Sequence, residues 1–185
     1  LNPLVIGTSP TRTNYGQYRN LVLGDENATF VFGNQTSSYF YAMPIERARY
    51  KQSILPGTWT LNMSGSTAVN TQNLVLTDDS KTNSAVTFTD AGRVYNIISG
   101  SAGVLPVGGA TTAMDASGWT INSGSYGWML PDINLLLLSG EALEGIAADG
   151  GASLESSRSY DALGLNPQRF ITAISESAGI GNPTK

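Results

Sequence analysis

The sequence predicts a mainly β fold: an antiparallel sandwich or barrel-like domain with one or two short helices at its C-terminal end. Three observations lead to this prediction. Over the first 130 residues, short runs rich in β-branched and aromatic residues alternate with polar clusters. Those clusters contain Gly, Asn and Asp, which favour turns because Gly supplies positive φ and the other two bond their own backbone. Helical spacing of apolar residues begins only after Ser139.

The predicted strands follow one another at the short intervals that are typical of sandwiches and barrels. The stretch from Asn73 to Ser99 predicts a three-stranded meander, joined first by a six-residue loop and then by the tight turn Asp90-Ala91-Gly92. The predicted strands are Leu4–Ile6, Tyr18–Leu23, Thr29–Phe32, Ser38–Ala42, Thr58–Met63, Asn73–Thr77, Ala85–Thr89, Arg93–Ser99 and Trp119–Asn122.

The segment from Tyr126 to Leu138 is the most apolar in the chain and ends in four consecutive leucines. Continuous apolar runs are typical of a central strand that is buried on both faces. A second interpretation is that the segment is buried against another subunit, and the sequence leaves both open. The candidate interface residues are Trp128, Met129, Leu130, Leu136, Leu138 and, in the last predicted helix, Phe170.

Two short helices are predicted near the C-terminal end. Residues Gly140–Ala148 contain Ala and Glu and are followed by Asp-Gly-Gly, which ends a helix. Asn166 is a suitable N-cap and Pro167 suits the first helical position, so a second helix is expected over residues 167–178. Its apolar residues at helical spacing are Phe170, Ile171, Ile174 and Ala178. In a single structural unit, we expect residues 1–138 to form the β-rich domain and residues 139–185 to form a helical extension packed on it.

The composition argues against an enzyme. The chain has no Cys and no His, and only 13% of its residues are charged, against about 25% in an average soluble domain. Most nucleophilic triads and transition-metal sites depend on the two missing residue types. The chain also has no Gly-x-Ser-x-Gly elbow and no glycine-rich phosphate loop. We therefore expect no catalytic, cofactor-binding or metal-binding residues.

Adjacent carboxylates at Asp78 and Asp79, with Asp90 further on, are the feature that comes nearest to a calcium loop. The spacing of an EF-hand, with its glutamate at position 12, is absent. Asp pairs are common in turns, so a turn is the preferred interpretation.

Two groups of side chains are candidates for binding. Tyr39 and Tyr41 share one face of a predicted strand, where they could stack on sugar rings or anchor an interface, although such pairs more often pack across a sheet. Arg47, Arg49 and Lys51 would form a basic stripe on a strand, facing an acidic partner, a lipid headgroup or phosphates. A solvated strand face is the more common interpretation of such charges.

Neither nucleic acid nor a membrane is expected as a partner. The net charge is −4, so the chain has no overall positive field. The longest purely apolar run has four leucines, whereas a membrane-spanning helix needs about 20 apolar residues.

The Ser-, Thr-, Asn- and Gly-rich strands from Asn27 to Thr89 and the tract from Gly124 to Ile133 resemble bacteriophage virion proteins, namely tail-fibre, spike, decoration, neck or capsid-associated components. The resemblance implies a non-enzymatic assembly protein that forms a homo-oligomer, often trimeric, and lacks a cofactor. The implied partners are copies of itself and other virion proteins, and the implied location is the virion, assembled in the host cytoplasm. The alternative is a carbohydrate- or receptor-binding module at a fibre or spike tip, with a host-surface glycan as its ligand.

The low charge also has a consequence for the sheet edges. Natural monomers usually protect edge strands with Lys and other charged residues. With ten Lys and Arg residues in 185, this chain has few charges for that purpose. We therefore expect partner subunits to cover its edges.

Overall fold

The computed structural model describes residues 10–33, 35–37, 39–46, 52–64, 73–83, 85–104, 125–143, 170–171 and 173–174. These ranges contain the helices α1 (Pro10–Leu23) and α2 (Gly140–Leu143). The strands are β1 (Phe30–Phe32), β2 (Gln35–Ser37), β3 (Phe40–Pro44), β4 (Leu61–Ser64), β5 (Asn73–Asp78), β6 (Thr87–Thr89), β7 (Gly92–Ser99), β8 (Gly127–Leu130) and β9 (Leu135–Ser139). Two predicted strands, Leu4–Ile6 and Trp119–Asn122, lie outside the described residues.

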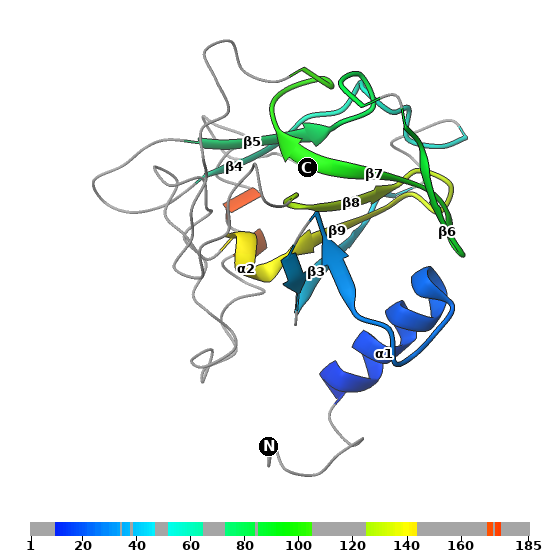
Figure 1. Ribbon diagram of the computed structural model, residues 1–185. Helices are drawn as coiled ribbons and strands as arrows, with labels where there is room; N and C mark the ends of the chain where they lie inside the picture. Colours follow the sequence, from blue (N-terminus) through cyan, green and yellow to red (C-terminus); the bar gives the residue numbers. More distant parts are fainter. Residues whose placement is uncertain are drawn as a thin grey trace.

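All strands except β1 and β2 form one antiparallel sheet (Figure 1). The strands follow the order β3-β9-β8-β7-β5-β4, and β6 pairs with β7 beside this path. The sheet curls into a half-barrel whose two ends are β3 and β4, while β1 and β2 form a separate hairpin. The predicted class, mainly antiparallel β with short helices, is confirmed.

The concave face of this sheet holds part of the apolar core. Residues directly opposite each other on antiparallel strands point to the same face. The register therefore aligns Met43, Leu136, Met129 and Tyr95 on one face of β3, β9, β8 and β7. Leu61 of β4 lines the same cavity as Met43 and Leu136. Since β3 and β4 are opposite ends of the sheet, the face that carries these side chains is the inner one.

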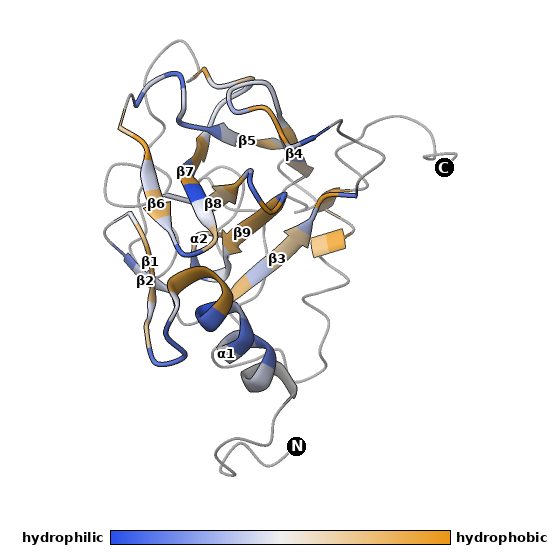
Figure 2. Cartoon of the chain, turned by 90° about the vertical axis from the view of Figure 1, so that its right-hand side faces the viewer, coloured by the Kyte–Doolittle hydropathy of each residue, from blue (hydrophilic) through white to orange (hydrophobic). Residues whose placement is uncertain are grey.

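Aromatic side chains from α1 and the β1–β2 hairpin cover the opposite, convex face. The ring of Phe30 lies 4.8 Å from that of Phe40 and 5.8 Å from that of Trp128. Tyr15 of α1 lies 5.0 Å from Phe40, and its hydroxyl donates a 2.9 Å hydrogen bond to the carbonyl oxygen of Ser37. Figure 2 shows the hydrophobic strands β8 and β9 near the centre of the molecule. The edge-to-face contacts join helix, hairpin and sheet into one core.

Helix α1 occupies the segment for which a strand, Tyr18–Leu23, was expected, so that prediction is wrong. Tyr15, Tyr18 and Val22 recur at spacings of three and four, which places them on one side of a helix. All three belong to the core or pack against it. Gly24 then ends the helix in the left-handed conformation, with φ of 70°.

The strands β5, β6 and β7 differ from the predicted meander. In β5, Thr77 lies opposite Ile98 in the C-terminal half of β7, whereas in β6, Phe88 lies opposite Arg93 in the N-terminal half. Both strands therefore line the same edge of β7, one after the other, and do not pair with each other. The tight turn from Asp90 to β7 is confirmed.

The C-terminal part is helical at residues 170–171 and 173–174, within the predicted helix. Phe170 and Ala173 are buried, but Ile171 is 63% exposed and points away from the core. The docking face therefore follows positions 170, 173 and 174. Helix α2 covers the first four residues of the predicted helix Gly140–Ala148, and the other five lie outside the described residues.

Gly127 is the first residue of β8, and it makes a close contact that yields a test of this packing. Its φ is 154°, and a Cβ added there would clash with the backbone carbonyl of Leu137. We expect Gly127→Ala to lower the free energy of unfolding by about 3 kcal/mol or more, because strand β9 cannot move away without breaking the core. The measurement is the midpoint of urea unfolding.

Gly16 in α1 is the matched control, since no heavy atom lies within 4 Å of a Cβ added at that position. Gly16→Ala should raise the free energy of unfolding by about 0.5–1 kcal/mol, because Ala is the better helix former. Loss of stability in both variants would contradict the distinction between the two sites.

Candidate functional site

A cavity of about 510 Å³ lies between the two ends of the curled sheet. Met43 of β3 and Leu136 of β9 form one wall, and Leu61 of β4 contributes to the opposite wall. The segment 53–60 supplies most of the remaining surface. Small-molecule sites commonly measure roughly 300–1,000 Å³ and often lie in the mouths of β-barrels. The cavity is therefore the candidate functional site.

The lining of this cavity is largely apolar and uncharged. None of the described residues that line it is ionisable. The aliphatic and thioether side chains are those of Met43, Ile45, Ile54, Leu55, Leu61 and Leu136. The polar atoms of the lining side chains are the indole N–H of Trp59 and the hydroxyls of Ser53, Thr58 and Thr60.

The indole N–H of Trp59 has less than 1 Å² of accessible surface, so it does not face the space of the cavity, although other parts of the residue line it. Its Nε1 atom is buried and has no hydrogen-bond acceptor in the described part of the chain. A buried donor without an acceptor costs about 1–3 kcal/mol. By contrast, the hydroxyl of Thr58 donates to the carbonyl oxygen of Leu55 at 2.8 Å, and that of Thr60 accepts a 3.0 Å hydrogen bond from the backbone N–H of Ala102.

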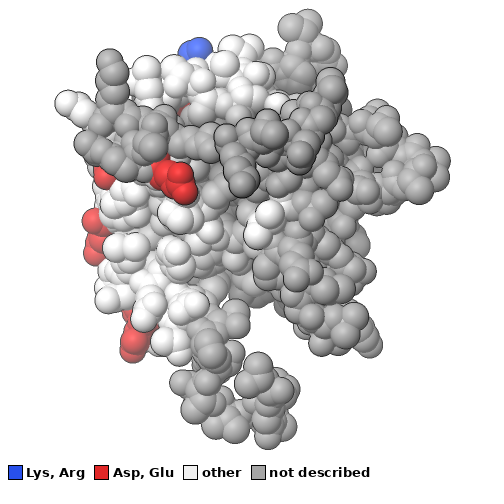
Figure 3. All heavy atoms as spheres, turned by 180° about the vertical axis from the view of Figure 1, so that it is seen from behind, with Lys and Arg blue, Asp and Glu red and all other residues white. Residues whose placement is uncertain are grey.

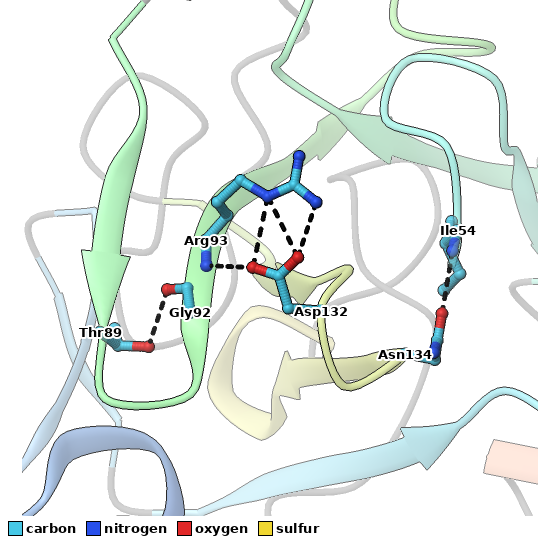
Figure 4. Close-up of polar contacts among 6 residues, drawn as sticks. All are labelled: Ile54, Thr89, Gly92, Arg93, Asp132 and Asn134. Carbon is cyan, nitrogen blue, oxygen red and sulfur yellow. Dashed lines mark hydrogen bonds and ion pairs between the residues drawn. The ribbon is translucent and has the colours of Figure 1, made fainter. Parts of the chain in front are cut away.

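Asn134, at the end of the turn between β8 and β9, holds two walls of the cavity together. Its side-chain Oδ1 accepts a 2.9 Å hydrogen bond from the backbone N–H of Ile54 (Figure 4). Its own carbonyl oxygen accepts a 2.9 Å hydrogen bond from the backbone N–H of Ile45. Asn134 adopts a left-handed conformation, with φ of 54°, which Asn tolerates better than most residues. One residue thus connects the end of β3 to the segment 53–60.

The end of β5 anchors the other part of that segment. Both carboxylate oxygens of Asp78 accept hydrogen bonds from the backbone N–H of Gly57, at 2.9 and 2.8 Å. The hydroxyl of Thr77 donates to the carbonyl oxygen of Trp59 at 2.9 Å. Asp78 is fully buried, and the hydrogen bonds that its carboxylate accepts from the backbone N–H groups of Gly57 and Ser80 compensate for the loss of water around it. Segment 53–60 is therefore held at both ends.

The neighbouring carboxylate of Asp79 likewise supports a loop. Its Oδ1 accepts a 2.9 Å hydrogen bond from the backbone N–H of Asn96, and its Oδ2 accepts a 3.0 Å hydrogen bond from the side chain of the same residue. Among the residues that the structure describes, no three metal-ligating side chains come together. Asp78 thus bonds segment 53–60, whereas Asp79 bonds β7.

A second polar group is buried where β2, β9 and α2 meet. The Oε2 atom of Glu141 accepts hydrogen bonds from the hydroxyls of Ser37 and Ser139, at 2.6 and 3.3 Å. Glu141 is 4% exposed and both serines are fully buried. A site so enclosed offers no access to a substrate. We interpret it as a structural link between the β1–β2 hairpin and the main sheet.

The structure places the predicted interface residues of the apolar tract inside this chain. Met129, Leu130, Leu136 and Leu138 are at most 2% exposed. Trp128 packs against the β1–β2 hairpin. Burial within the chain itself accounts for their apolar character. The geometry therefore gives no support to an interface at these positions.

Of the predicted binding residues, the structure describes the two tyrosines, and both pack against other parts of the chain. Tyr39 and Tyr41 lie on the same face of the strand, as expected, with ring centroids 6.4 Å apart. Tyr41 stacks on Phe170 at 4.6 Å, and a Cβ added at Gly140 would clash with the ring of Tyr39. Both tyrosines are half-buried. The basic stripe is made of Arg47, Arg49 and Lys51, and all three lie outside the described residues.

Sequence reasoning did not identify the cavity. It assigned Thr58–Met63 to a strand, but β4 begins at Leu61 and residues 58–60 line the cavity. A local signal was available, since two apolar residues, Ile54 and Leu55, stand directly before a Pro-Gly pair that favours a turn. The contact with Asn134, 80 positions away, had no local signal.

Comparisons with models of known protein families, with characterised proteins and with solved structures give no match. The function is therefore argued from the fold and the cavity. None of the helices in the described ranges has the length and apolarity needed to cross a bilayer.

The Asn134 link can be tested with three variants. Asn134→Asp keeps the Oδ1 acceptor and should preserve the protection of the Ile54 amide from hydrogen exchange. Asn134→Gly keeps the left-handed conformation but removes the acceptor, so that amide should exchange faster. Asn134→Ala adds backbone strain and should lower the free energy of unfolding further, by about 1–3 kcal/mol in total. An unchanged exchange rate of the Ile54 amide in Asn134→Gly would contradict the link.

The ion pair beside this turn should make stability depend on pH. The Nη2 atom of Arg93 lies 2.6 Å from Oδ1 of Asp132, and the backbone N–H of Arg93 donates to Oδ2 at 2.7 Å (Figure 4). The hydrogen bonds from the Arg93 side chain, and then from its backbone, lower the pKa of Asp132 below its ordinary 3.8. The stabilisation from this ion pair is therefore fully present above pH 3.8, the ordinary pKa of the group. It is lost as the pH falls through the lowered pKa of the folded protein.

Asp132→Asn removes the charge of this pair. Since Arg93 and Asp132 are 39% and 36% exposed, we expect the variant to lose at most about 1 kcal/mol at pH 7. The difference from the original protein should shrink in urea unfolding at about pH 2.5. An equal difference at both pH values would show that the charge is not responsible.

Proposed function

We propose that the chain is a non-enzymatic structural or assembly protein of a virus particle and works as a homo-oligomer. The observation that supports a homo-oligomer is that β6 is an edge strand. It pairs with β7 on one side, and in the described part of the chain no strand pairs with its other side. Phe88 at its centre is 69% exposed, and the preceding Val86 is 42% exposed.

The segment Ala85–Thr89 lacks the charged residues and the proline that often protect an edge strand. Its residues after Ala85 are β-branched or aromatic. Such a segment is prone to pair with another strand. Most of the described surface visible in Figure 3 is likewise uncharged. Pairing of β6 with a second copy would satisfy its free N–H and C=O groups and cover Phe88.

The assignment to a virus particle rests on composition and on the resemblance of two tracts to bacteriophage virion proteins. Strands rich in Ser, Thr, Asn and Gly, with few charges, suit a protein whose contacts are hydrogen bonds with neighbouring subunits. The buried carboxylates described above, Asp78, Asp79 and Glu141, form hydrogen bonds within the fold. This arrangement supports a structural role in preference to catalysis.

The alternative, a carbohydrate- or receptor-binding module, relied on Tyr39 and Tyr41. Their contacts with Gly140 and Phe170 are those of a packed core. A glycan-binding function would therefore need another surface, and the assembly function is the better supported of the two.

The oligomer can be tested by measuring the solution mass across a concentration series with size exclusion and light scattering. We expect an oligomer whose dissociation midpoint rises at least about tenfold in Phe88→Lys, because the new charge would be buried at the interface. Val104→Lys is the matched control: Val104 is also exposed, at 56%, but it lies beyond the other end of β7. A monomer at every concentration, or equal effects of both variants, would contradict the proposed interface.

A further inference from the structure

We propose that two copies of the chain pair antiparallel through β6, around a two-fold axis at Thr87, so that the homo-oligomer contains a closed dimer. This inference rests on the proposed assembly function and specifies how the edge strand would be covered. In this register Val86 of each copy lies opposite Phe88 of the other, and the two Thr87 residues lie opposite each other.

The pairing of β6 with β7 determines which backbone groups of β6 point to its free edge. Phe88 lies opposite Arg93. The backbone N–H of Arg93 donates to Oδ2 of Asp132 at 2.7 Å, on the side of β7 away from β6 (Figure 4). Opposite residues in an antiparallel pair alternate between those that exchange hydrogen bonds and those that do not. Phe88 and Arg93 therefore do not exchange hydrogen bonds, and the N–H and C=O groups of Phe88 point away from β7.

Other hydrogen bonds of β7 agree with this alternation. Ile97 lies four positions after Arg93, and its carbonyl oxygen accepts a 2.8 Å hydrogen bond from the backbone N–H of Tyr126, directly before β8. The intervening Asn96 turns the other way, because its carbonyl oxygen accepts a 3.0 Å hydrogen bond from the backbone N–H of Asp79, directly after β5. The alternation is therefore continuous along β7, and it determines the direction of the free groups of β6.

Helix α1 limits the free edge at the C-terminal end of β6. The backbone N–H of Asp90 donates to the carbonyl oxygen of Val22, near the end of α1, at 3.2 Å. A register centred on Phe88 would place Val86 of the second copy opposite Asp90, whose N–H is already bonded. With the axis at Thr87, Val86 and Phe88 of one copy exchange backbone hydrogen bonds with Phe88 and Val86 of the other. This register therefore satisfies more of the edge.

The side chains along this edge are complementary to those of a second copy. Phe88 and Val86 are 69% and 42% exposed, and residues two positions apart share one face of a strand. The two-fold axis places each Phe88 against Val86 of the other copy, and aromatic residues opposite β-branched ones stabilise antiparallel pairs. On the other face, the exposed Thr87 meets its own copy, which is also a favourable pair. The segment 85–89 carries no charge, so no like charges are brought together.

The symmetry of this contact sets the size of the assembly that it forms. Both copies use the same strand, so the interface is isologous and closes on itself. Each β6 strand then pairs with one other β6 strand, and the contact cannot add a third copy. The inferred unit is therefore a dimer and not the trimer that the resemblance to virion proteins implies.

The experiment introduces single cysteines, because the chain has none. Opposite residues that do not exchange hydrogen bonds have Cα atoms about 4.5 Å apart, within the range of about 4.4–6.8 Å that a disulfide spans. Thr87→Cys is oxidised with diamide at a concentration above the dissociation midpoint of the oligomer. We expect most chains to appear as a disulfide-linked dimer on a non-reducing denaturing gel.

Ala85→Cys is the matched control, because Ala85 is also exposed and lies two positions away. In the proposed register it faces Thr89 of the second copy, so the two cysteines would be about 13 Å apart along the strands. This variant should remain a single chain on the same gel.

The outcomes separate this pairing from the homo-oligomer itself. Absence of the Thr87→Cys cross-link, equal cross-linking of both variants, or a solution mass of three chains overturns the two-fold pairing. If the solution mass of the original chain still shows an oligomer, the proposed assembly function stands. A monomer at every concentration overturns both.

Discussion

Strand β9 is buried on both faces along its whole length, and the rest of the structure depends on this constraint. An apolar strand of this kind needs a cover on each side. On the convex side, α1 and the β1–β2 hairpin provide an aromatic layer centred on Phe30 and Phe40. On the concave side the sheet curls, so that Leu61 of β4 lines the same cavity as Leu136 of β9. Gly127 allows β8 to pack directly against the backbone of β9.

The same curling produces the candidate site. The sheet does not close, because β3 and β4 form the two ends of its path and do not pair with each other. Segment 53–60 lies across this opening, attached to Asn134 on one side and to Asp78 on the other. Its apolar side chains and Trp59 line the space that remains. The buried polar residues of this region therefore shape the cavity without adding charge to its lining.

Local patterns were sufficient to predict most of the strands, since segments such as β1, β5 and β7 are separated by residues that favour turns. The misassigned helix α1 shows where local reasoning failed. Its tyrosines are favoured in strands, yet Pro10 at the first helical position and the spacing of Tyr15, Tyr18 and Val22 were signals of a helix. The cavity lay beyond any local pattern, because it requires the curvature of the sheet and contacts such as Ile54–Asn134.

The pairing of β3 with β9 also bears on how the chain folds. Hairpins such as β8–β9 join neighbouring segments, but Phe40 of β3 pairs with Ser139 of β9, which lies far along the chain. Contacts of such long range form slowly, because the intervening chain must first close into a loop. During synthesis, β3 leaves the ribosome long before its partner. Strand β3 therefore stays unpaired until β9 has been made, and this makes the closing of the β3–β9 pair the step most vulnerable to aggregation.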